Sequence, residues 1–266
     1  MHRTMKTIEY IHIHNSIELI RHKDKILALF ASCFQKELNP DLWDWAYIKN
    51  PLGSAIVNLA FIDNRLVGHY AFIPLKTTKY NVLLSMTTMV DVSARKYNIF
   101  LELAEKSYSF AKKLGFDVII GFPNAKSAII HEKLLGWSLK QTFIAQCDIK
   151  TLQQSLSFKT TMNKSSCFLD ILHHDFLHWR LSKPNIKYVQ NNQNIFKNFN
   201  QNEIDILTMR DENIFNLKID KKINFITQSC RFEKYKTFSY PFAYKSLDNE
   251  KKAYNFYVEL LMSDVF

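Results

Sequence analysis

Apolar residues in the first 150 positions recur with two different periods, which predicts alternating helices and strands. Residues 24–35 (DKILALFASCFQ) and residues 100–114 carry apolar side chains at helical spacing, and a glycine follows the second segment and ends it. Residues 55–62 and 66–74 are rich in β-branched and aromatic residues and are joined by the short polar sequence DNR. This arrangement indicates a β-hairpin between two amphipathic helices.

The rest of the first half extends this pattern. Further strands are expected at residues 7–14, 81–92, 118–122 and 137–149, and further helices at residues 40–49 and 127–135. The resulting order of strands and helices is β, α, α, β, β, β, α, β, α, β. It predicts a mixed α/β layer.

The second half follows a different composition. Residues 150–166 are polar and without a clear period, so we place a domain boundary there, with one domain over residues 1–150 and another over residues 151–266. All five glycines precede residue 140. In the second domain, strands are expected at residues 203–209, 214–219, 237–244 and 254–261, and a helix at residues 221–232.

One internal similarity connects the two halves. LWDWAYIKNP at residues 42–51 is similar to FLHWRLSKPN at residues 176–185, and each is an aromatic helical segment that runs into a lysine and a proline. Coincidence and duplication both explain a single match of this length. Duplication would make the second half a shrunken copy of the first.

The formal net charge is +10, which suits a polyanionic ligand and equally suits a lysine-rich, solvated surface. The chain has no dense run of Arg and Lys and no recognisable nucleic-acid-binding signature, so we expect no nucleic-acid partner.

The four cysteines are scattered without a CxxC pair, which argues against a zinc ribbon or a disulfide scaffold and fits reduced thiols in the cytoplasm. His173, His174, Asp175 and His178 have a spacing that a metal could use, but no fourth ligand is evident and we expect no metal. No segment approaches the roughly 20 apolar residues that a membrane span requires. We therefore expect a cytoplasmic protein.

The most informative segment is TMVDVSARKYNIF at residues 88–100, an apolar strand that runs through a basic loop into a helix. Backbone N–H groups and the positive end of a helix converge at such junctions, which makes them phosphate sites. Loops that approach a pyrophosphate usually contain glycine, and this one has none. The loop is thus either a phosphate site or the remnant of one.

Residues 23–137 resemble the GNAT superfamily of acyl-CoA N-acyltransferases, most of all the bacterial branch found near polysaccharide and amino-sugar genes. The segments that carry the resemblance occur in family order: WAYIKNPLG, LVGHYAFIP, TMVDVSARKYNIF, LELAEKSYSFAKKLG and IIGFPNAKSAIIHEKLLGW. The ending FYVELLMSDVF is similar to the C-terminus of two-module relatives. The resemblance implies an α/β fold of the N-acyltransferase type, followed by a smaller, degenerate GNAT-like α/β half.

In this superfamily the pantetheine arm of acyl-CoA lies between two splayed strands. The resemblance implies that it pairs with backbone groups of Met89, Val90 and Asp91. It also implies that the pyrophosphate is wrapped by Arg95, Lys96, Tyr97, Asn98 and Ile99.

Two positions of that loop depart from the family pattern, because Lys96 and Asn98 replace glycines. Asn tolerates the left-handed backbone region better than other non-glycine residues, so Asn98 can keep the turn. Lys96 adds a charge that can pair with phosphate, but a positive φ at this residue would cost about 1 kcal/mol or more.

The resemblance also implies the catalytic candidates. An Asn equivalent to Asn124 faces the cofactor, and the residue seven positions later, often Tyr, protonates the leaving thiolate; here it is His131. His69 is a candidate base for the amine, and Ser127 is a candidate contact of a CoA phosphate. Each has a structural alternative: His131 packing at a helix edge, His69 in the core and Ser127 as a helix cap.

The expected function is therefore acetyl transfer from acetyl-CoA to a small-molecule amine, such as an amino sugar used in surface polysaccharide. The alternatives are a non-catalytic module of the same fold, which binds a ligand or partner, and an aminoacyl or peptidoglycan-bridge transferase. The acceptor, the length of the acyl chain and the oligomeric state are left open by the sequence.

Overall fold

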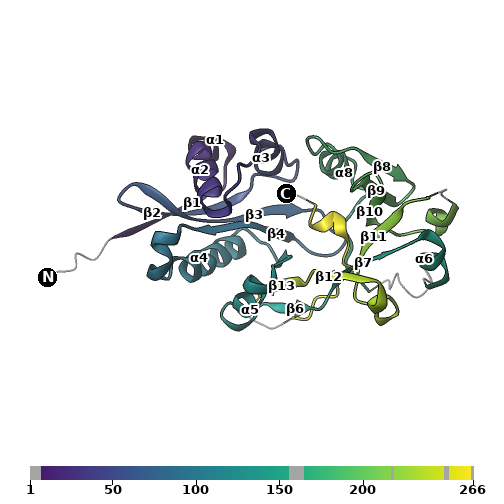
Figure 1. Cartoon of the computed structure of the whole chain (residues 1–266). Coiled ribbons are helices and arrows are strands. Elements are labelled where there is room, and N and C mark those ends of the chain that lie inside the picture. The colour runs from purple at the N-terminus through teal and green to yellow at the C-terminus, as the bar shows by residue number, and fades with distance from the viewer. Residues whose placement is uncertain (1–6, 156–164, 217–218, 249–251, 265–266) are drawn as a thin grey trace. The chain divides into compact units, whose positions relative to one another are not determined.

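The computed structural model describes residues 7–155, 165–216, 219–248 and 252–264, and Figure 1 shows the course of the chain. The chain forms two compact units. Unit 1 comprises Met1–Leu75, Asn81–Ile119 and Ser246–Lys251, and unit 2 comprises Lys76–Tyr80, Ile120–Lys245 and Lys252–Phe266. The proposed boundary at residue 150 concerns independent folding, which this grouping does not test, and it stays a prediction.

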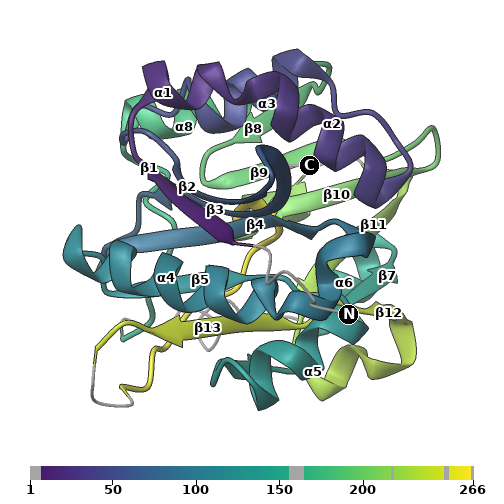
Figure 2. The same cartoon turned by 90° about the vertical axis from the view of Figure 1, so that its left-hand side faces the viewer.

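Unit 1 contains four antiparallel strands of the first mixed sheet, with helices on both faces. Its elements are β1 (Ile8–Ile13), α1 (Ser16–Arg21), α2 (Lys23–Phe34), α3 (Pro40–Tyr47), β2 (Ile56–Ile62), β3 (Arg65–Leu75), β4 (Val82–Val90), the 3₁₀ helix η1 (Val92–Tyr97) and α4 (Ile99–Lys113). Strands β1 to β4 pair in sequence order. Helices α1 to α3 lie on one face of this sheet and α4 on the other (Figure 2). Strand β5 (Val118–Gly121) follows α4 and leads from unit 1 into unit 2.

The sequence of the hairpin explains its position at the centre of the sheet. Every residue of β2 is buried, because helices cover both faces, and a run that is apolar except for Asn58 suits such a strand better than alternation does. The turn places Asp63 at φ 52° and Asn64 at φ 63°, the double left-handed conformation of a tight hairpin. A Cβ atom at Gly68 would lie 2.8 Å from side-chain atoms of both Ile99 and Leu103, so this glycine allows α4 to pack closely on β3.

Unit 2 contains a second mixed sheet. Its elements are α5 (Ala125–Lys133), β6 (Ser138–Lys140), β7 (Phe143–Cys147), α6 (Ile149–Ser155), α8 (His174–Leu181), β8 (Tyr188–Asn191), β9 (Asn194–Asn198), β10 (Glu203–Thr208), η2 (Glu212–Asn216), β11 (Lys222–Thr227), η3 (Cys230–Tyr235), β12 (Lys236–Ser239), β13 (Phe242–Ser246) and η4 (Leu260–Met262). Six of the strands form a sheet in the order β12-β7-β11-β10-β9-β8, in which β10 and β11 run parallel. Strand β13 pairs with β6.

The core of unit 2 lies against this sheet. Phe225 of β11 and Phe232 of η3 meet edge to face with ring centroids 4.9 Å apart, and Leu152 of α6 is fully buried in the same cluster. The C-terminal segment is fixed to the unit by a buried ion pair. Nε of Arg210 donates to Glu259 at 2.7 Å, a second bond joins the same two groups, and Glu259 is 3% exposed.

The prediction of a mixed α/β fold is confirmed, with two mixed sheets and helices around them. The helices predicted at residues 24–35 and 100–114 are α2 and α4, and the predicted hairpin is β2–β3. The two similar segments are helical in both halves, as α3 and α8. Helix α1 was not predicted, because its six residues carry too little periodicity.

Three predictions for the second half are wrong. Residues 221–232 contain strand β11 and η3 instead of a helix, because KINFIT is rich in β-branched residues and pairs with strands on both sides. Residues 214–219 include the end of η2 and no strand within the described residues, although Ile214 is buried. Residues 254–261 have alternating apolar positions but make only an isolated bridge from Phe256 to Cys167 before η4, since burial of aromatic rings rather than strand pairing holds them.

Candidate functional site

The junction from β4 to α4 in unit 1 is built around Asp91. Its carboxylate accepts hydrogen bonds from the backbone N–H of Ser93 at 2.9 Å and from the Ser93 hydroxyl at 2.6 Å, and it pairs with the Arg65 guanidinium at 2.5 Å. The hydroxyl of Ser93 is the main cause that lowers the pKa of Asp91, and Arg65 lowers it further. Asp91 is thus a carboxylate that caps η1 and fixes the loop to the hairpin.

The backbone of Asp91 is also engaged within unit 1. Its N–H donates to the carbonyl of Val67 at 2.8 Å, and its carbonyl accepts from the N–H of Ala94 at 2.9 Å. The neighbouring carbonyl of Val90 accepts from Nε of Arg95 at 3.3 Å. The predicted pairing of Met89, Val90 and Asp91 with pantetheine stays a prediction. Because the Asp91 N–H is already bonded, pantetheine could pair with Asp91 only through the second lone pair of its carbonyl oxygen.

Asn98 begins α4 in the left-handed conformation, with φ 58° and ψ 19°, which confirms that this residue can keep a turn usually made by glycine. Lys96 is not among the described residues with positive φ, so the expected backbone strain at this position does not arise. Its ammonium lies 5.1 Å from the centre of the Tyr97 ring, a cation–π contact. The loop therefore replaces two glycines without strain at Lys96.

A cavity of about 390 Å³ opens beside this loop. Cations Arg65 and Lys96, the carboxylate of Asp63, Ser93 and Tyr97 line it. Among the described side chains, none forms a hydrogen-bonded cap at the start of α4, whose first backbone N–H groups carry the positive end of a 15-residue helix. Arg65 is paired with Asp91, so Lys96 and the uncapped start of α4 are the features here that suit a phosphate group.

A second feature of unit 1 is a bulge where β3 and β4 pair. The register shifts between His69 and Ala71, and on β4 Thr87 has φ 47°, an unusual conformation for a β-branched residue. The Thr87 carbonyl accepts a hydrogen bond from Nδ1 of His69 at 2.7 Å. The Thr87 hydroxyl forms a hydrogen bond with the hydroxyl of Tyr47. Side chains from β3 and α3 therefore hold the bulge.

The environment of His69 makes it a neutral imidazole. It is fully buried, its ring lies edge to face against Tyr47 at 6.1 Å, and burial lowers its pKa to about 4. Because a carbonyl oxygen can only accept, Nδ1 carries the proton and Nε2 carries a lone pair. Within the described part of the chain this Nε2 atom is buried and has no hydrogen-bond partner. His69 can therefore accept a proton or a hydrogen bond only from a group that enters its surroundings.

The other three predicted residues belong to unit 2 and are described by themselves. Asn124 caps α5, since its side-chain oxygen accepts from the backbone N–H of Ser127 at 2.9 Å, and the Ser127 hydroxyl donates back to Asn124. His131 is 7% exposed, donates from Nδ1 to the Ser127 carbonyl at 2.8 Å and meets Trp137 edge to face at 4.8 Å. Burial lowers the pKa of His131. The roles predicted for these residues toward CoA stay predictions.

The structure thus brings the loop residues, the β4 residues and His69 together in unit 1. Sequence reasoning missed Arg65 and Thr87 as parts of this site. Arg65 begins β3 directly after the hairpin turn, and only the pairing of β3 with β4 brings it to Asp91. Thr87 gives no sequence signal for a bulge, because threonine favours a regular strand.

Among the described residues, no group of three or more His, Cys, Asp or Glu side chains could hold a metal ion. The helices of the described segments include none that is both long enough and apolar enough to cross a membrane.

No family model and no curated protein sequence matches this chain. Similar solved structures exist at low identity. A GCN5-related N-acetyltransferase from Kribbella flavida has 9% identity and a TM-score of 0.62, over 90% of this chain and 72% of that one. A conserved protein of unknown function from Enterococcus faecalis V583 has 8% identity and a TM-score of 0.60, over 91% and 73%. A GCN5-related N-acetyltransferase from Anabaena variabilis has 9% identity and a TM-score of 0.56, over 90% and 73%. The chain therefore has the fold of the GCN5-related N-acetyltransferases, the GNAT fold.

Proposed function

We propose that this chain is an acyl-CoA-dependent N-acyltransferase that transfers an acetyl group from acetyl-CoA to a small-molecule amine. The observation that carries the proposal is the junction of β4, η1 and α4, where a basic, uncapped helix start lies beside a cavity in a GNAT fold. The left-handed Asn98 supports it, because the loop keeps a turn that its sequence had put in question.

The residues present fit the cofactor. Lys96 offers positive charge in a cavity of about 390 Å³, and the N–H groups at the start of α4, which follow in the chain, offer donors for a pyrophosphate. We assign the pyrophosphate to the loop from Arg95 to Ile99, the pantetheine to the backbone of Met89 and Val90, and further CoA contacts to Asn124 and Ser127. When bound, acetyl-CoA supplies the activated thioester.

The protein's part in the reaction is positioning and proton transfer. Holding an amine beside a bound acyl donor replaces a bimolecular encounter with an oriented one, which supplies much of the rate enhancement. We assign His69 as the base, because it is neutral and its Nε2 lone pair is unused within the described residues. We assign His131 as the group that protonates the leaving thiolate. Because Nδ1 donates to the Ser127 carbonyl, Nε2 must first take up the proton released by the attacking amine, and the resulting imidazolium then passes that proton to the thiolate.

The finer part of the proposal concerns the substrate. We propose that the acceptor is an amino sugar that is later used in surface polysaccharide, and that the reaction takes place in the cytoplasm. The basis is the resemblance to the bacterial GNAT branch found near polysaccharide and amino-sugar genes. In the same scheme residues 1–150 form the acyltransferase domain, and residues 151–266 form a degenerate GNAT-like half that shapes the acceptor side.

A second candidate function is a non-catalytic module of the same fold that binds a ligand or a partner. The geometry of both histidines favours it, because each is buried and each uses one ring nitrogen to bond a backbone carbonyl. An aminoacyl or peptidoglycan-bridge transferase is a third and weaker candidate.

Calorimetric titration with acetyl-CoA, followed by an assay of free CoA release with glucosamine, separates these functions. Binding with release of CoA supports the N-acyltransferase, and binding without release on a panel of amines supports the non-catalytic module. No binding at millimolar acetyl-CoA overturns the main proposal. Transfer from aminoacyl-tRNA, with no CoA released, would support the third candidate.

A further inference from the structure

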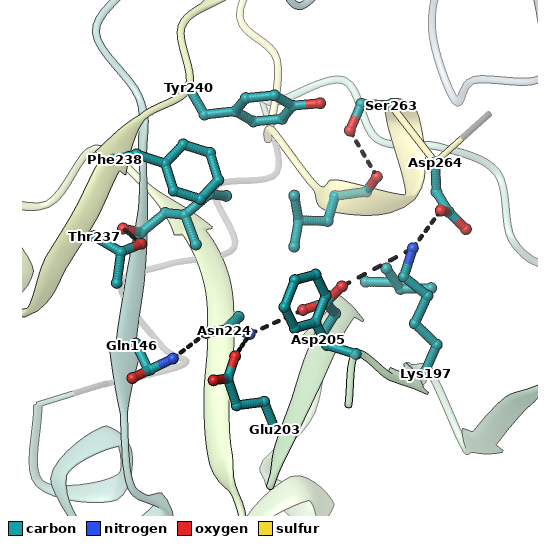
Figure 3. A pocket seen from close by; sticks show the side chains of 14 residues that line it. Gln146, Lys197, Glu203, Asp205, Asn224, Thr237, Phe238, Tyr240, Ser263 and Asp264 are labelled. Carbon is teal, nitrogen blue, oxygen red and sulfur yellow. Dashed lines mark hydrogen bonds and ion pairs between the residues drawn. The ribbon is translucent and has the colours of Figure 1, made fainter. Parts of the chain in front are cut away.

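Unit 2 contains its own cavity, of about 340 Å³, on one face of its six-stranded sheet (Figure 3). Side chains of β7, β9, β10, β11 and β12 line it, together with the turn around η4. Its size falls within the range of small-molecule sites. None of the residues predicted from the sequence to act in acyl transfer lines this cavity.

One wall of the cavity is a fixed set of hydrogen-bond acceptors. The side-chain N–H groups of Asn224 donate to Glu203 and to Asp205, at 3.1 Å in each case, and its oxygen accepts from Gln146 at 3.0 Å. Asn224 thereby spends both of its N–H donors on the two carboxylates. A carboxylate accepts about four hydrogen bonds, so Glu203 and Asp205 keep acceptor capacity that faces the cavity.

The lysines nearby are already neutralised. Lys197 lies 2.5 Å from Asp264 and 3.9 Å from Asp205, and Lys183 lies 3.1 Å from Asp264. Although burial opposes it, these two lysines hold the pKa of Asp264 at about 2. Among the charged side chains that line the cavity, Glu203, Asp205 and Asp264 are acids and Lys197 is the one base, while Lys183 and Arg180 compensate Asp264 from outside the lining. The cavity favours a cation over an anion.

Aromatic side chains also line the cavity. Phe199 is 64% exposed and Phe238 is 54% exposed, and both line the cavity, where Phe238 meets Tyr240 edge to face at 6.0 Å. Exposed rings beside a polar pocket mark binding surfaces more often than isolated surface residues do. Such rings pack against the C–H face of a sugar-like ring and attract a cation.

We propose that this cavity binds a hydroxylated primary amine in its protonated form, with the ammonium on Glu203 and Asp205 and an apolar face on Phe238. Unpaired carboxylate oxygens require N–H and O–H donors, which this ligand class supplies in number. The ligand class is that of the acceptor in the proposed function, and the proposal rests on that function for its choice of an amino sugar as probe. Because binding is measured without acetyl-CoA, its failure is distinguishable from a failure of acyl transfer.

The test is calorimetric titration of the full chain with glucosamine, in the absence of acetyl-CoA, at pH 7. N-acetylglucosamine is the matched probe, since it keeps the ring and loses the ammonium. We expect glucosamine to bind and N-acetylglucosamine to bind at least tenfold more weakly. Equal affinity for the two sugars, or no binding of glucosamine at tens of millimolar, overturns the proposal.

Two variants locate the binding. Asp205→Asn keeps the shape and an acceptor for Asn224 while removing the charge, and should weaken glucosamine at least tenfold. Phe238→Ala changes an exposed ring that the fold does not bury, and should weaken it severalfold. Asp175→Asn and Leu172→Ala are matched controls, because these side chains are exposed elsewhere in unit 2 and should leave affinity unchanged. Wild-type affinity in both test variants, with thermal unfolding confirming that they are folded, also overturns the proposal.

Discussion

Nδ1 of His69 donates a hydrogen bond to the carbonyl of Thr87, 2.7 Å away, and so joins β3 to the residue at which β4 leaves regular strand geometry. Thr87 has φ 47°, which costs on the order of 1–3 kcal/mol for a residue that is not glycine. The bond fixes the bulge and, because Nδ1 must carry the proton, also fixes the tautomer of the imidazole.

This environment makes stability depend on pH through His69. Its pKa is about 4 in the folded protein and 6.5 for the free side chain, so the unfolded chain binds more protons between these values. The contribution of His69 is fully present above pH 6.5, falls as the pH drops toward 4, and amounts to about 3 kcal/mol in total. Urea unfolding at pH 7.5, 5.5 and 4.5 measures this decrease.

His69→Gln is the control for that experiment, because glutamine can donate to Thr87 and does not titrate in this range. The free energy of unfolding should fall less steeply with acid in the variant than in the wild type. The same pH dependence in both proteins would assign the titration to other groups, such as His131, whose pKa burial also lowers.

Asn98 provides a test of the loop backbone. Asn98→Gly should leave the free energy of unfolding nearly unchanged, since glycine adopts φ 58° without cost in the folded state. Asn98→Val should lower it by about 1–3 kcal/mol, because a β-branched residue is strained there. Chemical denaturation of the two variants measures the difference, and equal stability would show that the turn relaxes to another conformation.

The basic loop is tested through the phosphates of the cofactor. Arg95→Ala combined with Lys96→Ala should weaken the affinity for CoA about tenfold or more and leave that for pantetheine nearly unchanged, because only CoA carries the pyrophosphate. Lys113→Ala, in the last turn of α4, is the matched removal of a charge and should have little effect on either. An equal loss for CoA and pantetheine would contradict the assignment of the loop.

The parts of this fold that sequence could predict are those decided by local pattern. Helices α2 and α4 and the β2–β3 hairpin follow from the period of their apolar residues and from the turn between the strands. Strand β11 was missed although its sequence KINFIT is rich in β-branched residues, because a run of six residues is a weak signal. The strands that pair with β11 on both sides cannot be read from that run.

The candidate site divides in the same way. The left-handed conformation of Asn98 agrees with the glycine of the family pattern at this position and with the tolerance of asparagine for that conformation. The contact of Arg65 with Asp91 depends on three paired strands, and the bulge at Thr87 on side chains from β3 and α3. In unit 2, the cavity acids Glu203 and Asp205 occupy alternate positions of an ordinary strand, which gave no signal.

The close packing of α4 on the sheet is tested at Gly68. Gly68→Ala would place a Cβ atom 2.8 Å from side-chain atoms of Ile99 and Leu103, which are both fully buried and have little room to move. Overpacking of this kind costs about 1–3 kcal/mol in the free energy of unfolding.

Gly53→Ala is not a suitable control, since alanine at a φ of 123° would be strained by itself. Ser93→Ala is not suitable either, because it removes the hydroxyl that donates to Asp91.

A suitable comparison is the double variant Gly68→Ala with Leu103→Ala, in which the second change makes space for the new methyl group. Its loss of stability should be smaller than the sum of the losses in the two single variants. Additive losses would show that Gly68 and Leu103 do not compete for space.

The buried ion pair of Arg210 and Glu259 is the last test, and it concerns the C-terminal segment of unit 2. Glu259→Gln keeps the shape of the side chain and leaves the Arg210 guanidinium without its counter-charge. The guanidinium remains in place, because it also donates a hydrogen bond to the Leu169 carbonyl at 2.9 Å. Breaking a buried pair costs about 3–5 kcal/mol in the free energy of unfolding, because the remaining charge stays desolvated. The exposed pair of Glu233 and Lys236, 3.3 Å apart, is the control, and Glu233→Gln should cost about 1 kcal/mol or less. Equal small losses in both variants would mean that water reaches Arg210 once Glu259 is changed, and that the segment is held by its aromatic contacts instead.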